Sequence, residues 1–120
     1  MMPHAAFFTD QLAQIYASHG KIDAAIQISV EALSILDRDK LLRERNVDGL
    51  LHTVGLLFLQ VGRVPDAESA LENALNANPN RTDTRSELIR HYRSIGKEQK
   101  ASEHEKYLAS NTEPPAATQP

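Results

Sequence analysis

Cysteine is missing from the 120-residue sequence, and aromatic residues make up only 5% of it. Without a thiol, the chain can form no disulfide, no thiolate nucleophile and no cysteine-based metal site. Neither sign of charge dominates, because 13 lysines and arginines stand against 16 aspartates and glutamates, a formal net charge of −3. This balance argues against a protein held on nucleic acid or on an anionic membrane by bulk charge.

The chain also lacks long hydrophobic runs. Its most apolar stretch is residues 54–59, whereas a membrane-spanning helix needs roughly 20 apolar residues. The first eight residues have neither a basic start nor a long apolar segment, so we expect no signal peptide. Together with the absent cysteines, these features favour a cytoplasmic protein with one folded domain. The proline-rich residues 111–120 have no large apolar side chain, and we expect them to be a disordered tail.

What the sequence does contain is helical periodicity. Apolar residues recur three and four positions apart along most of the chain, which is the spacing of one face of a helix. Gly20, Gly62 and Gly96 interrupt the pattern and close their helices, and Gly20 suits the left-handed position that follows a helix. Thr82 or Asp83 is expected to cap the fifth helix. The pattern predicts six helices and no β-sheet.

The helical pattern repeats at a fixed interval. Gly96 follows Gly62 by 34 residues, and Tyr92 follows Phe58 by the same 34. Gly62 follows Gly20 by 42 residues, so we expect about two extra helical turns around residues 37–46. The chain is therefore predicted to consist of three similar units.

The second unit combines apolar, small and aromatic residues in a characteristic order, namely Leu51, Val54, Gly55, Phe58, Gly62, Ala67, Leu71, Ala74 and Pro79. This order resembles the tetratricopeptide repeat (TPR) family, a helix–turn–helix repeat of about 34 residues. The resemblance covers about residues 7–110. It implies an all-α fold of three tandem hairpins, at about 5–37, 47–79 and 81–110, forming a short right-handed solenoid. It also implies that Gly55 faces Ala67, and that Phe58 and Leu71 fill the gap between hairpins.

Four positions depart from the family pattern. Ser29 and Asp37 in the first unit, and Arg85 and Glu105 in the third, stand where large apolar residues or proline are usual. An unrelated helical bundle is the alternative fold. Pentatricopeptide repeats have a similar period and bind RNA, but this slightly acidic chain lacks the basic surface that they require.

In TPR proteins the first helix of each hairpin lines a concave groove. The resemblance implies a partner-binding groove made of Asp10, Gln14, His52, Thr53, Leu56, Gln60, Asp83, Glu87 and Arg90. Leu56 lies off the packing stripe of its helix, so it either offers apolar surface to a ligand or packs against a neighbouring hairpin.

Members of one TPR subfamily clamp the C-terminal carboxylate of chaperone tails with lysine, asparagine and arginine. The corresponding positions here are Asp10, Gln14, Thr53, Asp83 and Glu87. The two aspartates and the glutamate would repel a carboxylate. We therefore expect no chaperone-tail binding. The expected partner is another protein that presents a neutral or basic peptide or amphipathic helix, with neither nucleic acid nor membrane as a ligand.

Two classes of function remain open at this point. An adaptor or scaffold that binds a partner in its groove is favoured. The alternative is a self-associating module, such as a homodimer, or a fragment of a longer solenoid, because Phe7 and Phe8 open the first helix with apolar side chains.

Catalytic and metal-binding patterns are scarce. The five histidines, His4, His19, His52, His91 and His104, include no pair one helical turn apart with an acid between them. No glycine-rich phosphate loop or nucleophile elbow occurs either. We expect a binding protein without a cofactor or metal, and not an enzyme.

Overall fold

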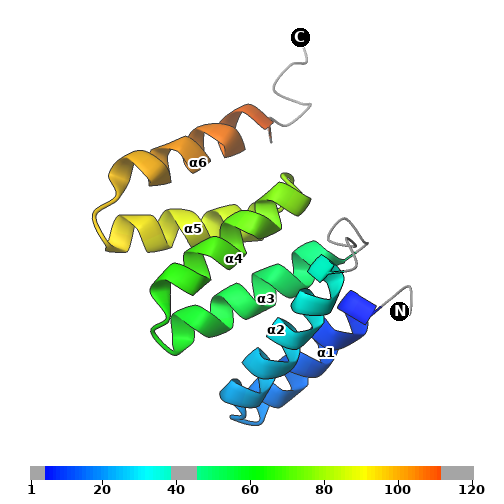
Figure 1. Ribbon diagram of the computed structural model, residues 1–120. Coiled ribbons are helices and arrows are strands. Elements are labelled where there is room, and N and C mark those ends of the chain that lie inside the picture. The colour runs from blue at the N-terminus through cyan, green and yellow to red at the C-terminus, as the bar shows by residue number, and fades with distance from the viewer. Residues whose placement is uncertain (1–4, 39–45, 112–120) are drawn as a thin grey trace. The chain divides into compact units, whose positions relative to one another are not determined.

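The computed structural model describes residues 5–38 and 46–111, and all regular structure in these two ranges is helical. The elements are α1 (Ala5–Ser18), α2 (Ile22–Arg38), α3 (Val47–Gln60), α4 (Val64–Ala77), α5 (Thr82–Ser94) and α6 (Glu98–Asn111) (Figure 1). The prediction of an all-α chain with six helices is confirmed for the described residues. Most of the expected extra turns at 37–46 and nearly all of the expected tail at 111–120 lie outside those residues.

The chain divides into two compact units, Met1–Asn80 and Arg81–Pro120. In the first unit α1 packs on α2 and α3 packs on α4, while α3 also contacts both α1 and α2. In the second unit α5 packs on α6. Each of the three sequential pairs is an antiparallel helical hairpin (Figure 1). The boundary between the units falls where the sequence places the end of the second hairpin.

The turns inside the three hairpins share one geometry. A glycine with positive φ follows each first helix, at Gly20 (79°), Gly62 (82°) and Gly96 (81°). The next residue is basic in every case, and its amide donates to the carbonyl of the last aromatic residue of the helix: Lys21 to Tyr16 at 2.9 Å, Arg63 to Phe58 at 2.9 Å and Lys97 to Tyr92 at 2.8 Å. This bond satisfies a carbonyl at the helix end, and the positive φ favours glycine. The predicted left-handed Gly20 is confirmed, and Gly62 and Gly96, which were predicted to close their helices, adopt the same conformation.

Helix α3 forms the centre of the first unit's core. Its Leu50, Val54 and Leu57 are at most 6% exposed. They share two hydrophobic clusters with residues of α1 and α2, namely Ala6, Ala13, Ala25, Ile26 and Leu36. Phe58 belongs to the same core, so its predicted role in joining the first two hairpins agrees with its position.

Gly55 lies at the close approach of α3 and α4, and its nearest neighbours on α4 are Leu71 and Ala70. A Cβ at residue 55 would lie 2.7 Å from Cγ and Cδ2 of Leu71 and 3.5 Å from Cβ of Ala70. Ala67 is fully buried in the core and lies about one helical turn before Leu71, so its contact with Gly55 stays a prediction. Leu71 contacts Gly55 inside its own hairpin.

Three of the residues that depart from the TPR pattern have specific contacts. The buried Ser29 donates its hydroxyl to the Ala25 carbonyl at 2.8 Å. The buried Arg85 bonds through Nη1 to Nδ1 of His104 at 3.0 Å, and its guanidinium lies 3.5 Å from the ring centroid of Tyr107. Glu105 accepts two bonds from an arginine, Arg93, at 2.6 and 2.9 Å. At these positions, polar partners replace the usual apolar packing.

The start of α5 differs from the prediction. The N-cap residue is Arg81, whose side chain makes no capping bond, and Thr82 and Asp83 already belong to the helix. Asp83 instead accepts the backbone amide of Thr84 at 2.8 Å and pairs with Arg81. The prediction that Thr82 or Asp83 is the cap was wrong, because Asp83 bonds inside the first turn.

Candidate functional site

The predicted groove residues of the first unit lie on the open side of α3. His52, Thr53, Leu56 and Gln60 follow one another at helical spacing, on the side opposite to the buried stripe of α3. Gln60 is exposed, and the other three are half-buried. The helix presents these residues outward because its remaining circumference packs on α1, α2 and α4.

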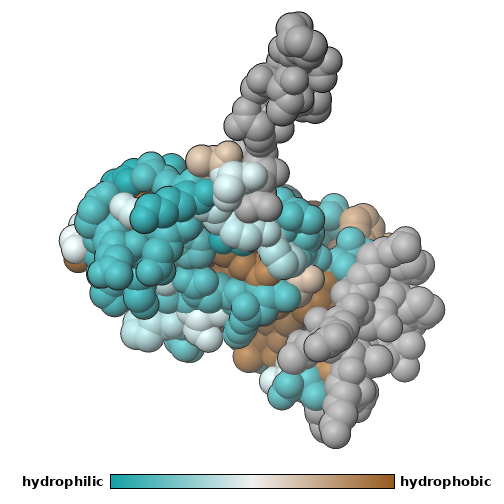
Figure 2. Space-filling view, turned by 90° about the horizontal axis from the view of Figure 1, so that it is seen from above, coloured by the Kyte–Doolittle hydropathy of each residue, from teal (hydrophilic) through white to brown (hydrophobic). Residues whose placement is uncertain are grey.

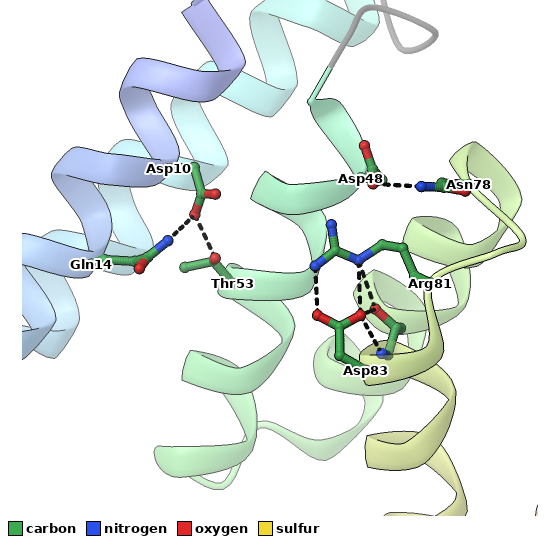
Figure 3. A network of polar contacts seen from close by, with 8 residues as sticks. Asp10, Gln14, Asp48, Thr53, Asn78, Arg81 and Asp83 are labelled. Carbon is green, nitrogen blue, oxygen red and sulfur yellow. Dashed lines mark hydrogen bonds and ion pairs between the residues drawn. The ribbon is translucent and has the colours of Figure 1, made fainter.

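A hydrogen-bond network connects α1 to this side of α3. The hydroxyl of Thr53 donates to Oδ1 of Asp10, and Nε2 of Gln14 donates to the same oxygen at 3.0 Å (Figure 3). The network brings together three predicted site residues that are up to 43 positions apart in sequence. It also fixes the carboxylate of Asp10 beside the open side of α3.

The Asp10 carboxylate is half-exposed, and its hydrogen bonds to Gln14 and Thr53 both fall on one oxygen. The second oxygen, Oδ2, receives no hydrogen bond among the described residues. An ionised carboxylate with one open oxygen can accept a donor from a ligand, and a charged donor makes the stronger bond. The site thus combines one anionic acceptor, neutral polar groups and the apolar side chain of Leu56.

The remaining predicted residues form their own group on α5, in the second unit. Asp83, Glu87 and Arg90 are spaced by four and three residues, so they lie on one side of α5. Glu87 is ion-paired with Arg90, and the hydrogen bond and charge of Glu87 raise the pKa of Arg90. Asp83 is paired with Arg81 at 2.8 Å (Figure 3).

These pairs change the expected charge of the site. The acids expected to repel a carboxylate include Asp83 and Glu87, but Arg81 pairs with Asp83 and Arg90 pairs with Glu87. The sequence did not assign Arg81 to the site, because this residue precedes the helix. The separation of only two residues between Arg81 and Asp83 was the sequence feature that could have indicated this ion pair. Asp10 is consequently the site acid whose contacts include no arginine among the described residues.

Two hollows lie elsewhere on the first unit, and none of the nine predicted residues lines either of them. The first, of about 340 Å³, is lined by residues that include Ile26, Val30, Val61 and Arg63. The second, of about 290 Å³, shares Val30 and lies beside α2, α3 and α4. Sequence reasoning missed both, because a hollow between helices depends on how their side chains pack. In the view of Figure 2, most of the visible surface is hydrophilic, and a smaller area of hydrophobic residues is exposed.

In the parts of the chain that the structure describes, no group of three or more histidine, aspartate and glutamate side chains is arranged to hold a metal ion. The helices in those parts are too short or too polar to cross a membrane. Comparison with known proteins finds no family model that matches the chain and no significant match among curated proteins.

Proposed function

We propose that the chain is a TPR-like adaptor that binds a peptide or short helix of another protein on the open side of α1 and α3. Support for the TPR-like assignment comes from the three hairpin turns, which share a positive-φ glycine and the same backbone hydrogen bond. Their recurrence means that the sequence period corresponds to a repeated local structure, as expected for tandem hairpins.

The observation that carries the binding proposal is the network of Asp10, Gln14 and Thr53. It holds polar side chains of α1 and α3 in a defined arrangement, leaving Oδ2 of Asp10 as an acceptor. Leu56 and Gln60 continue the same side of α3. A binding site that has its polar groups fixed before the ligand arrives loses less entropy on binding.

The ligand that fits this chemistry is a neutral or basic segment with one hydrophobic anchor. A lysine or arginine of the ligand would bond to Asp10, and the anchor would pack on Leu56. Charges on the surface are screened over about 8 Å at physiological salt, so the apolar contact should provide most of the affinity and Asp10 the selectivity. An acidic tail with a free carboxylate would meet Asp10 as a like charge.

Fluorescence titration can test the proposal with two peptides, a basic amphipathic one with a leucine anchor and an acidic tail that ends in a carboxylate. The wild type should bind the basic peptide more tightly. Asp10→Asn should reduce this preference, and Leu56→Ser should weaken binding of both peptides. Gln27→Ala is the matched control, because Gln27 is an exposed polar residue on α2 and should have no effect.

The second unit is tested separately with the double substitution Asp83→Lys/Glu87→Arg. If α5 also contacts the ligand, this variant should lose its preference for the basic peptide. Tighter binding of the acidic tail by the wild type, or equal binding by the wild type, Asp10→Asn and Leu56→Ser, would reject the proposed site on α1 and α3.

A further inference from the structure

Helix α1 carries an apolar stripe that the fold of its own unit leaves open. Phe8, Leu12 and Ile15 are spaced by four and three residues and are 53%, 44% and 54% exposed. At about 100° per residue, they lie on the side of α1 away from Ala6 and Ala13, which are buried. Single apolar residues scattered over a surface are normal, whereas these three half-exposed side chains form one continuous row.

The equivalent three positions are buried in the other two hairpins. Shifting the stripe by the 42 residues between Gly20 and Gly62 gives Leu50, Val54 and Leu57, which are 0%, 1% and 6% exposed and pack against α1 and α2. A further shift of 34 residues gives positions 84, 88 and 91, which are at most 8% exposed. The stripe on α1 thus has the spacing of a row that is buried in the other two hairpins. It shares its apolar chemistry with the row on α3, which packs on apolar residues of α1 and α2.

We propose that a second copy of this chain covers the stripe, so that the protein forms a symmetric dimer through α1. In a two-fold symmetric contact, a residue at the centre of the stripe meets the same residue of the other copy. A residue at one end meets a residue from the opposite end. Two antiparallel α1 helices would bring Leu12 against Leu12 of the other copy, and Phe8 near Ile15. The row is therefore complementary to itself.

Charge also favours a second copy. The single charged residue of α1 is Asp10, which lies on the opposite side of the helix from Leu12 and accepts bonds from Thr53 and Gln14. Two α1 helices can consequently approach without like-charge repulsion. A partner with a charged helix would find no opposite charge on this stripe.

A head-to-tail chain of copies fits less well. The α5–α6 hairpin presents the ion pairs of Arg93 with Glu98 and Glu105, whose side chains are 40–62% exposed. Covering this group with Phe8, Leu12 and Ile15 would take the charged side chains out of water, and their mutual ion pairs would repay only part of that desolvation cost. We therefore expect a closed dimer rather than α1 stacked on this hairpin.

The size of the stripe predicts a weak dimer. An aromatic side chain presents roughly 200 Å² when fully exposed, so Phe8, Leu12 and Ile15 at about half exposure offer on the order of 300 Å² per copy. A standard interface buries about 800 Å² per partner. Polar neighbours on α1 have to supply the remainder, and association should depend on concentration.

Sedimentation equilibrium of the full chain, from about 1 µM to about 1 mM, measures this association. The wild type should shift from monomer to dimer. Leu12→Arg should raise the dissociation constant at least about tenfold. Ile95→Arg is the matched control, since Ile95 is also 44% exposed but lies outside α1, and it should dimerise like the wild type. Circular dichroism should be recorded for each variant, to check that it remains helical.

The absence of cysteine permits a second measurement by disulfide trapping. Leu12→Cys should form a covalent dimer on mild oxidation, because residues near a two-fold axis can meet the Cα separation of about 7 Å or less that a disulfide needs. Ile95→Cys should form no covalent dimer, although it should associate non-covalently like the wild type. A wild type that is monomeric at about 1 mM, oligomers larger than dimers, or equal behaviour of the Leu12 and Ile95 variants would overturn the proposal. Peptide binding on α1 and α3 is a separate readout, which Leu12→Arg should retain.

Discussion

Gly55 lies against Leu71 so closely that a Cβ on residue 55 would come within 2.7 Å of two side-chain carbons of Leu71. Both residues are buried, and Leu71 is fully so. The missing side chain at residue 55 therefore allows α3 and α4 to pack at their present distance. Glycine in a helix interior costs up to about 1 kcal/mol relative to alanine, and here the close packing offsets that cost.

Gly55→Ala should lower the free energy of unfolding by about 1 kcal/mol. Overpacking in a core costs about 1–3 kcal/mol, and the gain in helix propensity of about 1 kcal/mol offsets only part of it. Urea denaturation monitored by circular dichroism measures the change. In a double-mutant cycle, Gly55→Ala/Leu71→Ala should cost less than the sum of the two single substitutions. Strict additivity would show that Leu71 is not the residue that the new methyl group meets.

Thr53→Val should destabilise the first unit by about 1 kcal/mol, because it removes the hydroxyl that bonds to Asp10 without changing the shape of the side chain. Thr53→Ser keeps the hydroxyl and should retain most of the stability. Thermal unfolding of the two variants separates the hydrogen bond from packing. Equal melting temperatures for valine and serine at this position would mean that the bond to Asp10 contributes nothing.

Tyr107→Leu should destabilise the α5–α6 hairpin by about 0.5–2 kcal/mol. The substitution removes the ring beneath the guanidinium of Arg85, which is buried. Tyr107→Phe keeps the ring and should lose less stability than Tyr107→Leu. Chemical denaturation of both variants checks the order, and a leucine variant as stable as the phenylalanine variant would contradict a contribution from the ring.

The hydrogen bonds from Arg93 lower the pKa of the Glu105 carboxyl below its ordinary value. Since the folded-state pKa lies below the unfolded one, the contribution to stability is complete above the unfolded pKa and disappears as the pH falls through the folded pKa. NMR titration should show a higher pKa for Glu105 in Arg93→Gln than in the wild type. Arg90→Gln removes an arginine that pairs with Glu87 and should leave Glu105 unchanged. An unaltered pKa in Arg93→Gln would exclude Arg93 as the cause.

Local features were predictable because their causes lie within a few residues. The helices follow from apolar spacing, and the turns follow from a glycine that can adopt a positive φ at 20, 62 and 96. The start of α5 was not predictable in the same way. Asp83 is a good capping residue by type, yet it pairs with Arg81 and bonds inside the first turn, so competing local partners decided its position.

The candidate site was predictable only as a set of residues on the outer sides of helices. Spacing placed His52, Leu56 and Gln60 on one side of α3, and the structure agrees. The bond between Asp10 and Thr53 joins two helices, and no sequence spacing indicates it. The pairing of Asp83 with Arg81 likewise altered the charge that the residue types alone suggested.

The sequence by itself determined six helices, their turns and the side of each helix that is apolar, because these depend on periodicity and on backbone preferences. Only the tertiary structure decided that Gly55 meets Leu71. It also decided that Leu50, Val54 and Leu57 are buried, whereas Phe8, Leu12 and Ile15, with the same spacing, are about half exposed. An amphipathic pattern shows which side of a helix avoids water, but burial depends on whether another surface lies close enough to cover that side.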